Sequence, residues 1–295
     1  MKPRQLWLLI LCGAIFGSTY VLVKDVIGIM GAVALAVVRT SIAGVGLWVI
    51  CRVRGVGPIG VPLRRTIILG VLSASIPYTF LALSTQFTNA GTASVVNSTV
   101  PVFTLVIAVT LGLMKAGSRS WWGMGLSLLG VILVAEQRQP HLGFGLVYGV
   151  ATGLVGSAAF GYSAIYARKY FSQAPVLKVA LSQQVVAAVT LAPLVLLFHP
   201  SAIPSFSDIV ILVVLGVFST AFAQFLFFWL ISEVGAVRTS YVNYLVPVFG
   251  VLWGGVFLSE PAPPLSYVGL VAVLGGLWLL LSPKRDVKVM PSSTY

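Results

Sequence analysis

Apolar runs of about 20 residues recur along the whole chain, and this pattern restricts the possible folds more than any other feature. A helix of that length crosses the roughly 30 Å hydrocarbon layer of a bilayer. Charged residues make up only 8% of the 295 residues and the mean hydropathy is +1.03, so a soluble domain would expose too much apolar surface. The chain is therefore predicted to be an all-α integral membrane protein.

Continuous apolar runs favour helices over a β-barrel, whose strands alternate apolar and polar residues. The first run follows a basic start without an evident small-residue cleavage site, which indicates an uncleaved signal anchor. We predict ten transmembrane helices, with approximate limits 6–27, 29–51, 66–87, 91–112, 120–136, 142–167, 177–198, 208–231, 237–258 and 264–282.

The net charge of +12 would suit a nucleic-acid-binding protein, but the positions of the basic residues exclude that class. With the N-terminus inside, fifteen of the eighteen Lys and Arg residues fall on the cytoplasmic side of the predicted topology. Lys24 and Arg138 fall on the opposite side, and Arg39 lies within a span. This bias follows the positive-inside rule and predicts that both termini are cytoplasmic.

The two halves of the chain repeat each other. An offset of 146 residues aligns NSTVPVF, which begins at Asn97, with NYLVPVF, which begins at Asn243. An offset of 144 aligns FGSTYVLVK, from Phe16, with FGYSAIYAR, from Phe160. We expect a first five-helix repeat in 1–140, a second in 141–284 and a cytoplasmic tail in 285–295.

Five is an odd number of crossings, so the second copy enters the membrane from the opposite face and the two repeats are inverted. Such halves can enclose a central cavity and exchange inward-open and outward-open forms, which is the basis of alternating access in transporters. The alternative is that the duplication is only a relic of the history of the gene.

The paired Asn and Pro residues indicate bends inside the bundle. Pro101 and Pro247 each remove an amide donor and free the carbonyl four residues earlier, which belongs to Asn97 or Asn243. Within a bilayer such a carbonyl must face protein or cavity water. The asparagines are therefore predicted either to line a substrate site and hinge or to join the two halves by hydrogen bonds.

Small residues recur every four positions in the sixth span, at Gly145, Gly149, Gly153, Ser157 and Gly161, and Gly17 is the counterpart of Gly161. Such a stripe lets neighbouring backbones approach closely. It suits static packing and equally suits a seam that moves, so Gly17 and Gly161 are candidate hinge residues together with Pro101 and Pro247.

The sequence contains no set of residues typical of an enzyme site, a metal site or an ATP-binding loop. We therefore predict no enzyme activity and no cofactor. All six acidic residues fall in loops, at span ends or in the tail, whereas proton-coupled carriers usually keep a carboxylate or histidine within the bilayer. This distribution favours facilitated diffusion.

Arg39 is the one charge well inside a span, and its repeat counterpart is Gln183. We predict a structural role, in which both donate to carbonyls near the bends; the alternative is that Arg39 binds substrate. The remaining polar and aromatic residues of the inner spans suit small zwitterions or amphipathic solutes better than phosphates. The candidate substrate-binding residues are Ser18, Tyr78, Asn97, Ser157, Tyr162, Gln224, Trp229, Tyr241, Asn243 and Tyr244.

These features resemble the drug/metabolite transporter superfamily, EamA type, and within it the bacterial YddG-like amino acid exporters. The resemblance covers nearly the whole chain. It is carried by FGSTYVLVK, the arginine of the second span, the repeated AxxxSxxNxxVPVF block, and LSEPAPPLSYVGLVAVLGG after the ninth span. It implies a cavity lined by the first, third, fourth, sixth, eighth and ninth spans.

The resemblance also implies a structural role for Glu260, which matches the acid that closes the ninth span in that family. The equivalent position in the first half is Met114, so the role is not symmetric. The leading prediction from the resemblance is a secondary transporter that exports aromatic and other neutral amino acids or related metabolites across the bacterial inner membrane by alternating access.

Other classes of function fit the sequence less well. A carrier for another small metabolite, drug-like solute or nucleotide sugar is the main alternative. An intramembrane enzyme or lipid-binding scaffold has less support. The expected partners are a small-molecule substrate and membrane lipids, without nucleic acid; the sequence leaves the oligomeric state open, and a monomer is the expectation.

Overall fold

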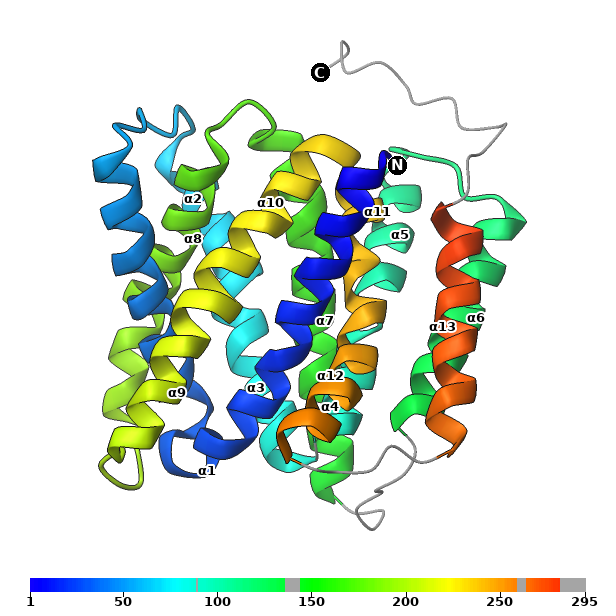
Figure 1. Ribbon diagram of the computed structural model, residues 1–295. Helices are drawn as coiled ribbons and strands as arrows, with labels where there is room; N and C mark the ends of the chain where they lie inside the picture. Colours follow the sequence, from blue (N-terminus) through cyan, green and yellow to red (C-terminus); the bar gives the residue numbers. More distant parts are fainter. Residues whose placement is uncertain (89, 136–143, 259–263, 282–295) are drawn as a thin grey trace.

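The computed structural model describes residues 1–88, 90–135, 144–258 and 264–281, and within these ranges the chain is helical with no strand. The helices form one bundle (Figure 1). Its α-helices are α1 (Pro3–Val53), α2 (Leu63–Gly70), α3 (Ile76–Phe87), α4 (Ala90–Asn97), α5 (Val100–Thr110), α6 (Ser118–Ala135), α7 (Phe144–Tyr170), α8 (Val176–Leu191), α9 (Phe206–Gly216), α10 (Ala223–Val234), α11 (Ala236–Ser240), α12 (Val242–Leu258) and α13 (Pro264–Leu281). Three short segments continue them: η1 (Val71–Ser75), η2 (Ala192–Leu196) and η3 (Val217–Phe222).

Seven helical segments in the described ranges are long and apolar enough to cross a membrane. They are Pro3–Val53, Leu63–Phe87, Thr92–Thr110, Phe144–Tyr170, Val176–Leu196, Phe206–Val234 and Pro264–Leu281. The protein is therefore a multi-pass membrane protein, as its apolar runs predicted.

The first of these segments is longer than a single crossing. Two predicted spans, 6–27 and 29–51, are joined in the 51-residue α1, which bends at Gly31. Gly31 has φ 65° and ψ 165°, a conformation that only glycine adopts without strain. The bend frees backbone carbonyls, and Ser201 binds two of them: its N–H donates to Ile29 O at 2.8 Å and its hydroxyl to Gly28 O at 3.2 Å. A tight turn thus replaces the expected loop.

The third and eighth predicted spans each contain a π-helical segment at equivalent positions. η1 begins at Val71 and η3 at Val217, which differ by the repeat offset of 146 residues. A wider turn leaves carbonyls for side chains to bind. Ser73 Oγ donates to Leu69 O at 2.6 Å, and Thr220 Oγ1 donates to Leu215 O at 2.8 Å. The sequence analysis did not predict these segments.

The two proline bends differ in detail. In the first half the chain breaks between α4 and α5, and Pro101 lies in the first turn of α5. In the second half the break lies earlier, at Tyr241 between α11 and α12, and Pro247 lies inside α12. Both prolines are buried, so both bends face protein rather than lipid.

The helices α6 and α13 occupy equivalent repeat positions and pack against each other at one edge of the bundle (Figure 1). A Cβ on Gly123 would lie 3.1 Å from Gly276 O, and one on Gly130 would lie 2.6 Å from Gly269 O. These two contacts exchange under the repeat, because Gly123 is equivalent to Gly269 and Gly130 to Gly276. Close backbone approach at glycine holds this helix pair together.

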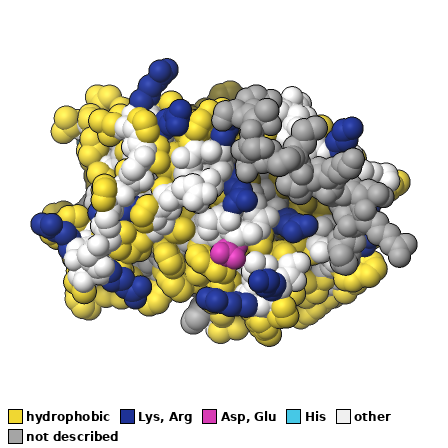
Figure 2. Space-filling model, turned by 90° about the horizontal axis from the view of Figure 1, so that it is seen from above, with side chains coloured by type: hydrophobic (Ala, Val, Ile, Leu, Met, Phe, Trp, Pro, Cys, Tyr) yellow, Lys and Arg dark blue, Asp and Glu magenta, His cyan; other side chains and the backbone are white. Residues whose placement is uncertain are grey.

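The start of α1 and the end of α13 lie at the same end of the bundle (Figure 1). Lys and Arg side chains are spread over this end, with little acidic surface among them (Figure 2). The bend of α1 and the end of α3 lie at the opposite end.

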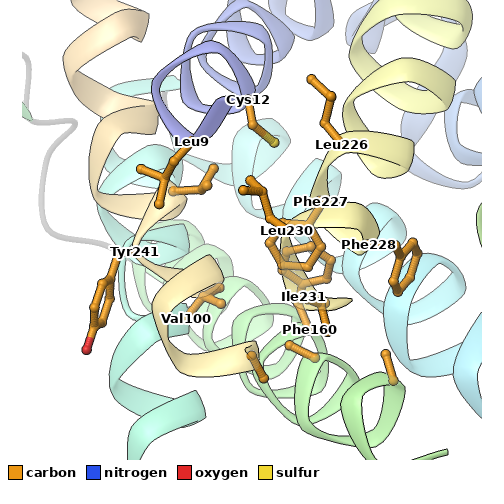
Figure 3. Packing of buried hydrophobic residues seen from close by; sticks show 14 of the residues in the cluster. Leu9, Cys12, Val100, Phe160, Leu226, Phe227, Phe228, Leu230, Ile231 and Tyr241 are labelled. Atoms are coloured by element: carbon orange, nitrogen blue, oxygen red, sulfur yellow. The ribbon is translucent and has the colours of Figure 1, made fainter. Parts of the chain in front are cut away.

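Aromatic and aliphatic side chains pack together in the interior between α1, α7 and α10 (Figure 3). Phe227 of α10 is fully buried and stacks on Phe160 of α7, with ring centroids 4.9 Å apart. Leu230, Ile231 and Cys12 belong to the same buried cluster. We call the buried residues Ala164 and Ala167 of α7 and Phe227, Phe228 and Ile231 of α10 the packed region.

Candidate functional site

A cavity lies within the bundle between α1, α3, α4, α7 and α12. Its lining mixes apolar side chains with hydroxyl, amide and guanidinium groups, which is typical of small-molecule sites. The lining residues are Phe16, Thr19, Tyr20, Val23, Arg39, Pro77, Tyr78, Leu81, Ala82, Thr85, Asn97, Phe160, Asn243 and Val246.

Tyr78 is at the centre of a buried hydrogen-bond network in the cavity wall. Its hydroxyl accepts a hydrogen bond from Gln224 Nε2 at 2.8 Å and a longer one from Gln184 Nε2 at 3.4 Å. The guanidinium carbon of Arg39 lies 4.2 Å from the centroid of the Tyr78 ring, a cation–π contact. Tyr78 and Gln224 are equivalent repeat positions, so this network joins the two halves directly.

Arg39 donates through Nε to Thr220 Oγ1 at 3.0 Å. This acceptor is a hydroxyl of η3, whereas the structural prediction expected a backbone carbonyl. Its counterpart Gln183 accepts from Ser73 Oγ of η1 at 2.7 Å. Both residues of the pair therefore reach a π-helical segment, but of the two only Arg39 lines the cavity.

Asn97 and Asn243 meet each other in the cavity lining. Asn97 Nδ2 donates to Asn243 Oδ1 at 3.2 Å, and Asn243 Nδ2 donates to Ser240 O at 2.9 Å. The backbone carbonyl of Asn243, which Pro247 deprives of its usual donor, accepts from Ser98 Oγ at 3.0 Å. The pair lines the cavity and also joins the two halves by a hydrogen bond.

Three of the ten candidate substrate-binding residues, Tyr78, Asn97 and Asn243, line the cavity. Gln224 lies directly behind Tyr78. Ser18 binds Ile15 O at 2.8 Å and approaches Ser219 Oγ at 3.3 Å, and Ser157 Oγ donates to Val96 O at 3.1 Å. The two serines therefore hold neighbouring helices together outside the cavity.

The four remaining aromatic candidates also lie outside the cavity. Tyr162 is 39% exposed and neighbours Tyr166 on the outer surface of α7. The guanidinium carbon of Arg4 lies 5.5 Å from the centroid of the Trp229 ring. Tyr241 and Tyr244 are buried, with ring centroids 6.4 Å apart, in the same apolar cluster as Phe227.

The two candidate hinge glycines make equivalent contacts. A Cβ on Gly17 would lie 2.9 Å from Val246 O, and one on Gly161 would lie 3.1 Å from Val100 O. Val100 and Val246 are themselves repeat counterparts, each just before a proline. Each glycine therefore lets a proline bend pack closely on the neighbouring helix.

Sequence reasoning missed much of the lining. Phe16, Thr19, Thr85 and Phe160 face the cavity. In a single sequence they look like other residues of apolar helices. The one available sign was that Phe16 and Phe160 occupy equivalent positions in the matched blocks FGSTY and FGYSA. Glu260 lies outside the described residues. Within the described ranges, no group of three His, Cys, Asp or Glu side chains is placed to hold a metal ion.

Comparison with known proteins identifies relatives over nearly the whole chain. Over 270 residues, the chain is 24% identical to an uncharacterized transporter of Archaeoglobus fulgidus, which covers 90% of this chain and 94% of that protein. It is 27% identical over 287 residues to the uncharacterized inner membrane transporter YedA of Escherichia coli K12, with 93% and 90% covered.

A crystal structure that is 17% identical in sequence shares the fold, with a TM-score of 0.79 and coverage of 93% of this chain and 95% of the other. The EamA-like transporter family matches twice, at residues 4–135 and 147–282, once in each half of the chain. The protein is thus a membrane transporter that belongs to the EamA-like transporter family of the drug/metabolite transporter superfamily.

Proposed function

We propose that the protein exports neutral and aromatic amino acids, or related metabolites, across a bacterial inner membrane by alternating access. The substrate class comes from the resemblance to YddG-like exporters. The observation that carries the mechanism is the pairing of repeat-equivalent residues, Asn97 with Asn243 and Tyr78 with Gln224, around one cavity. Such pairs lie on the line that relates the two halves, where a transporter of this kind binds its substrate.

The proposal includes ten membrane crossings as two inverted sets of five. Three observations support this count and arrangement. α1 is bent at Gly31 into two arms. Helices α4 and α5 together have the length of one membrane crossing with a break inside it, and so do α11 and α12. The equivalent helices α6 and α13 run in opposite directions along the bundle (Figure 1).

We infer that the end with the chain termini faces the cytoplasm. The Lys and Arg side chains at this end support that orientation through the positive-inside rule. YedA is described as an inner membrane transporter, and we place this protein in the same membrane.

Facilitated diffusion is the proposed mode of transport. The lining residues found in the described ranges include no Asp, Glu or His that would take up and release a proton. Export would then follow the concentration gradient of the solute alone.

Counterflow in proteoliposomes tests the proposal. Purified protein is reconstituted into liposomes preloaded with one amino acid at a time, and uptake of the labelled amino acid is measured with and without an imposed pH gradient. We expect exchange that does not depend on the gradient. Strict dependence on the gradient would refute facilitated diffusion. The absence of exchange with every amino acid tested would refute amino acid export.

A further inference from the structure

Arg39 places a buried positive charge at the wall of the cavity. Its side chain is only 6% exposed, and it lies on the second arm of α1 beyond the bend at Gly31. A charge at this depth in a membrane protein is costly, so its neighbours must compensate it or a ligand must.

The neighbours compensate Arg39 only in part. A guanidinium has five N–H donors, and among the described residues one of them, Nε–H, has a hydrogen-bond acceptor, the hydroxyl of Thr220. Tyr78 adds the face of its ring. The acidic residues in the described ranges are Asp25, Asp208 and Glu233, and none of them lines the cavity or pairs with Arg39.

The groups around Arg39 add further donors. The Tyr78 hydroxyl accepts from Gln184 and Gln224, which occupies its two acceptor positions and leaves its own O–H proton to be donated. No described residue accepts that proton. The hydroxyl oxygen of Thr19, also in the lining, is buried without a hydrogen-bond partner in the described part of the chain. Gln184 Oε1 and Gln224 Oε1 beside Tyr78 are also buried without a hydrogen-bond partner in the described part of the chain, so the charge of Arg39 is what distinguishes this wall, and it favours a negatively charged ligand.

Much of the rest of the lining is apolar, apart from the hydroxyl groups of Tyr20 and Thr85 and the amides of Asn97 and Asn243. Phe16, Val23, Leu81, Phe160 and Val246 supply aromatic and aliphatic surface without charge. A single guanidinium beside such a surface fits an organic monoanion with an apolar body. A planar carboxylate matches the fork of two guanidinium N–H groups, whereas a phosphate dianion would require further cations.

We propose that Arg39, positioned by Thr220 and Tyr78, binds the carboxylate of the transported solute. This inference deepens the proposed amino acid export by naming the group that the site recognises, and it rests on that function. It also assigns Arg39 a binding role beyond the structural role that the sequence favoured. Solutes that share the apolar body but lack the carboxylate should be rejected.

The repeat offers a conservative variant for the test. Gln183 occupies the counterpart position and is fully buried with a hydrogen bond from Ser73. Glutamine is therefore a residue that this environment accepts, and Arg39→Gln removes the charge while keeping an amide donor. Arg54→Gln removes a positive charge at the end of the same helix, where the side chain is exposed, and serves as the matched control.

The experiment measures binding in lipid nanodiscs with the full-length protein. Three probes share one side chain: leucine, 4-methylpentanoate, which lacks the ammonium group, and 3-methylbutylamine, which lacks the carboxylate. We expect leucine and 4-methylpentanoate to bind and the amine not to compete. Arg39→Gln should lower the affinity for both carboxylate probes by about tenfold or more. Arg39→Lys should lower it less, and Arg54→Gln should bind them with the affinity of the unmodified protein.

Selectivity separates binding from a structural role, because a merely structural Arg39 would change the affinity of all ligands together or lower the melting temperature without changing preference. The inference is overturned if the amine binds as well as the acids, if none of the probes binds, or if Arg39→Gln leaves carboxylate affinity unchanged. Arg39-dependent binding of carboxylates without amino acid counterflow would support the inference and refute amino acid export. Amino acid counterflow that Arg39→Gln leaves unchanged would support amino acid export and refute the binding role of Arg39.

Discussion

The cavity and the packed region are built from equivalent stretches of the two repeats, yet one is open and the other is filled. Phe16 to Val23 on α1 and Tyr78 to Thr85 on α3 contribute to the cavity lining. The counterparts of Tyr20, Val23, Leu81, Ala82 and Thr85 are Ala164, Ala167, Phe227, Phe228 and Ile231, which make up the packed region (Figure 3). Phe160, the counterpart of Phe16, lines the cavity as Phe16 does. Leu81, in the lining, corresponds to Phe227, which is fully buried.

This contrast indicates how the proposed carrier can work. If the two repeats exchanged their conformations, the cavity would close and an equivalent one would open at the packed region. The paired residues Asn97 with Asn243 and Tyr78 with Gln224 lie between the two regions and would stay in place. The difference between open and filled regions is thus the property that variants should test.

The largest expected effect separates Phe227 from its counterpart Leu81. Phe227→Ala removes a fully buried ring that stacks on Phe160 and should cost about 3–5 kcal/mol of stability. Leu81→Ala, at the half-buried position beside the cavity, should cost clearly less because its surroundings are already open. Thermal melting of the two purified variants measures the difference, and equal losses would contradict the contrast between the regions.

The next effect distinguishes the two asparagines. Asn243→Ala removes the partner of Asn97 Nδ2 and the donor to Ser240 O, which leaves two buried groups unsatisfied at about 1–3 kcal/mol each. Asn97→Ala leaves one buried group unsatisfied, Asn243 Oδ1. We therefore expect a lower melting temperature for the Asn243 variant than for the Asn97 variant. The reverse order would show that the hydrogen bonds are shared differently between the halves.

Glycine variants compare the two close helix contacts. A Cβ on Gly17 would approach Phe249 Cβ to 2.6 Å, whereas the nearest atom to a Cβ on Gly161 is Thr104 Oγ1 at 3.0 Å. Gly17→Ala should therefore cost about 1–3 kcal/mol, and Gly161→Ala should cost less. Gly28→Ala, with no atom within 4 Å of the added carbon, is the control and should melt like the unmodified protein.

The smallest effect concerns the carbonyl freed by Pro247. Ser98→Ala removes its donor and should cost about 1 kcal/mol. In a Pro247→Ala background the helix regains its own N–H donor, so the same serine change should cost less. A double-mutant cycle measured by thermal melting gives the coupling, and strict additivity would show that the hydroxyl and the proline act independently.

Much of this fold follows from sequence because apolar length, the positions of Lys and Arg, and the repeat each have a direct physical meaning. The interior position of both proline bends was predicted from sequence, and a hydrogen bond between the halves was one of the two roles predicted for Asn97 and Asn243. The contact of Tyr78 with Gln224 was not predicted, although the alignment of the halves places the two at equivalent positions. The predicted spans 6–27 and 29–51 place the break at residue 28, but the bend lies at Gly31. A glycine turn whose carbonyls are bound by Ser201 does not interrupt an apolar run, so hydropathy does not locate it.

The site was harder to predict than the fold. The halves have similar sequences and differ mainly in which one is open, and that depends on small differences in packing, such as Leu81 against Phe227. Tyr162 and Trp229 have the chemistry of a lining but face other surroundings. The π-helical segments η1 and η3 left no recognisable motif, although they hold the partners of Arg39 and Gln183.

Cysteine accessibility tests the exchange of conformations most directly. Thr85→Cys in the cavity lining and Ile231→Cys at the counterpart position are introduced separately, with Cys12 and Cys51 replaced by Ala, and their reaction with a hydrophilic maleimide is timed. The account predicts that Thr85→Cys reacts and Ile231→Cys does not, and that the two rates change in opposite directions during transport of leucine. Equal rates at rest, or rates that rise and fall together, would contradict it.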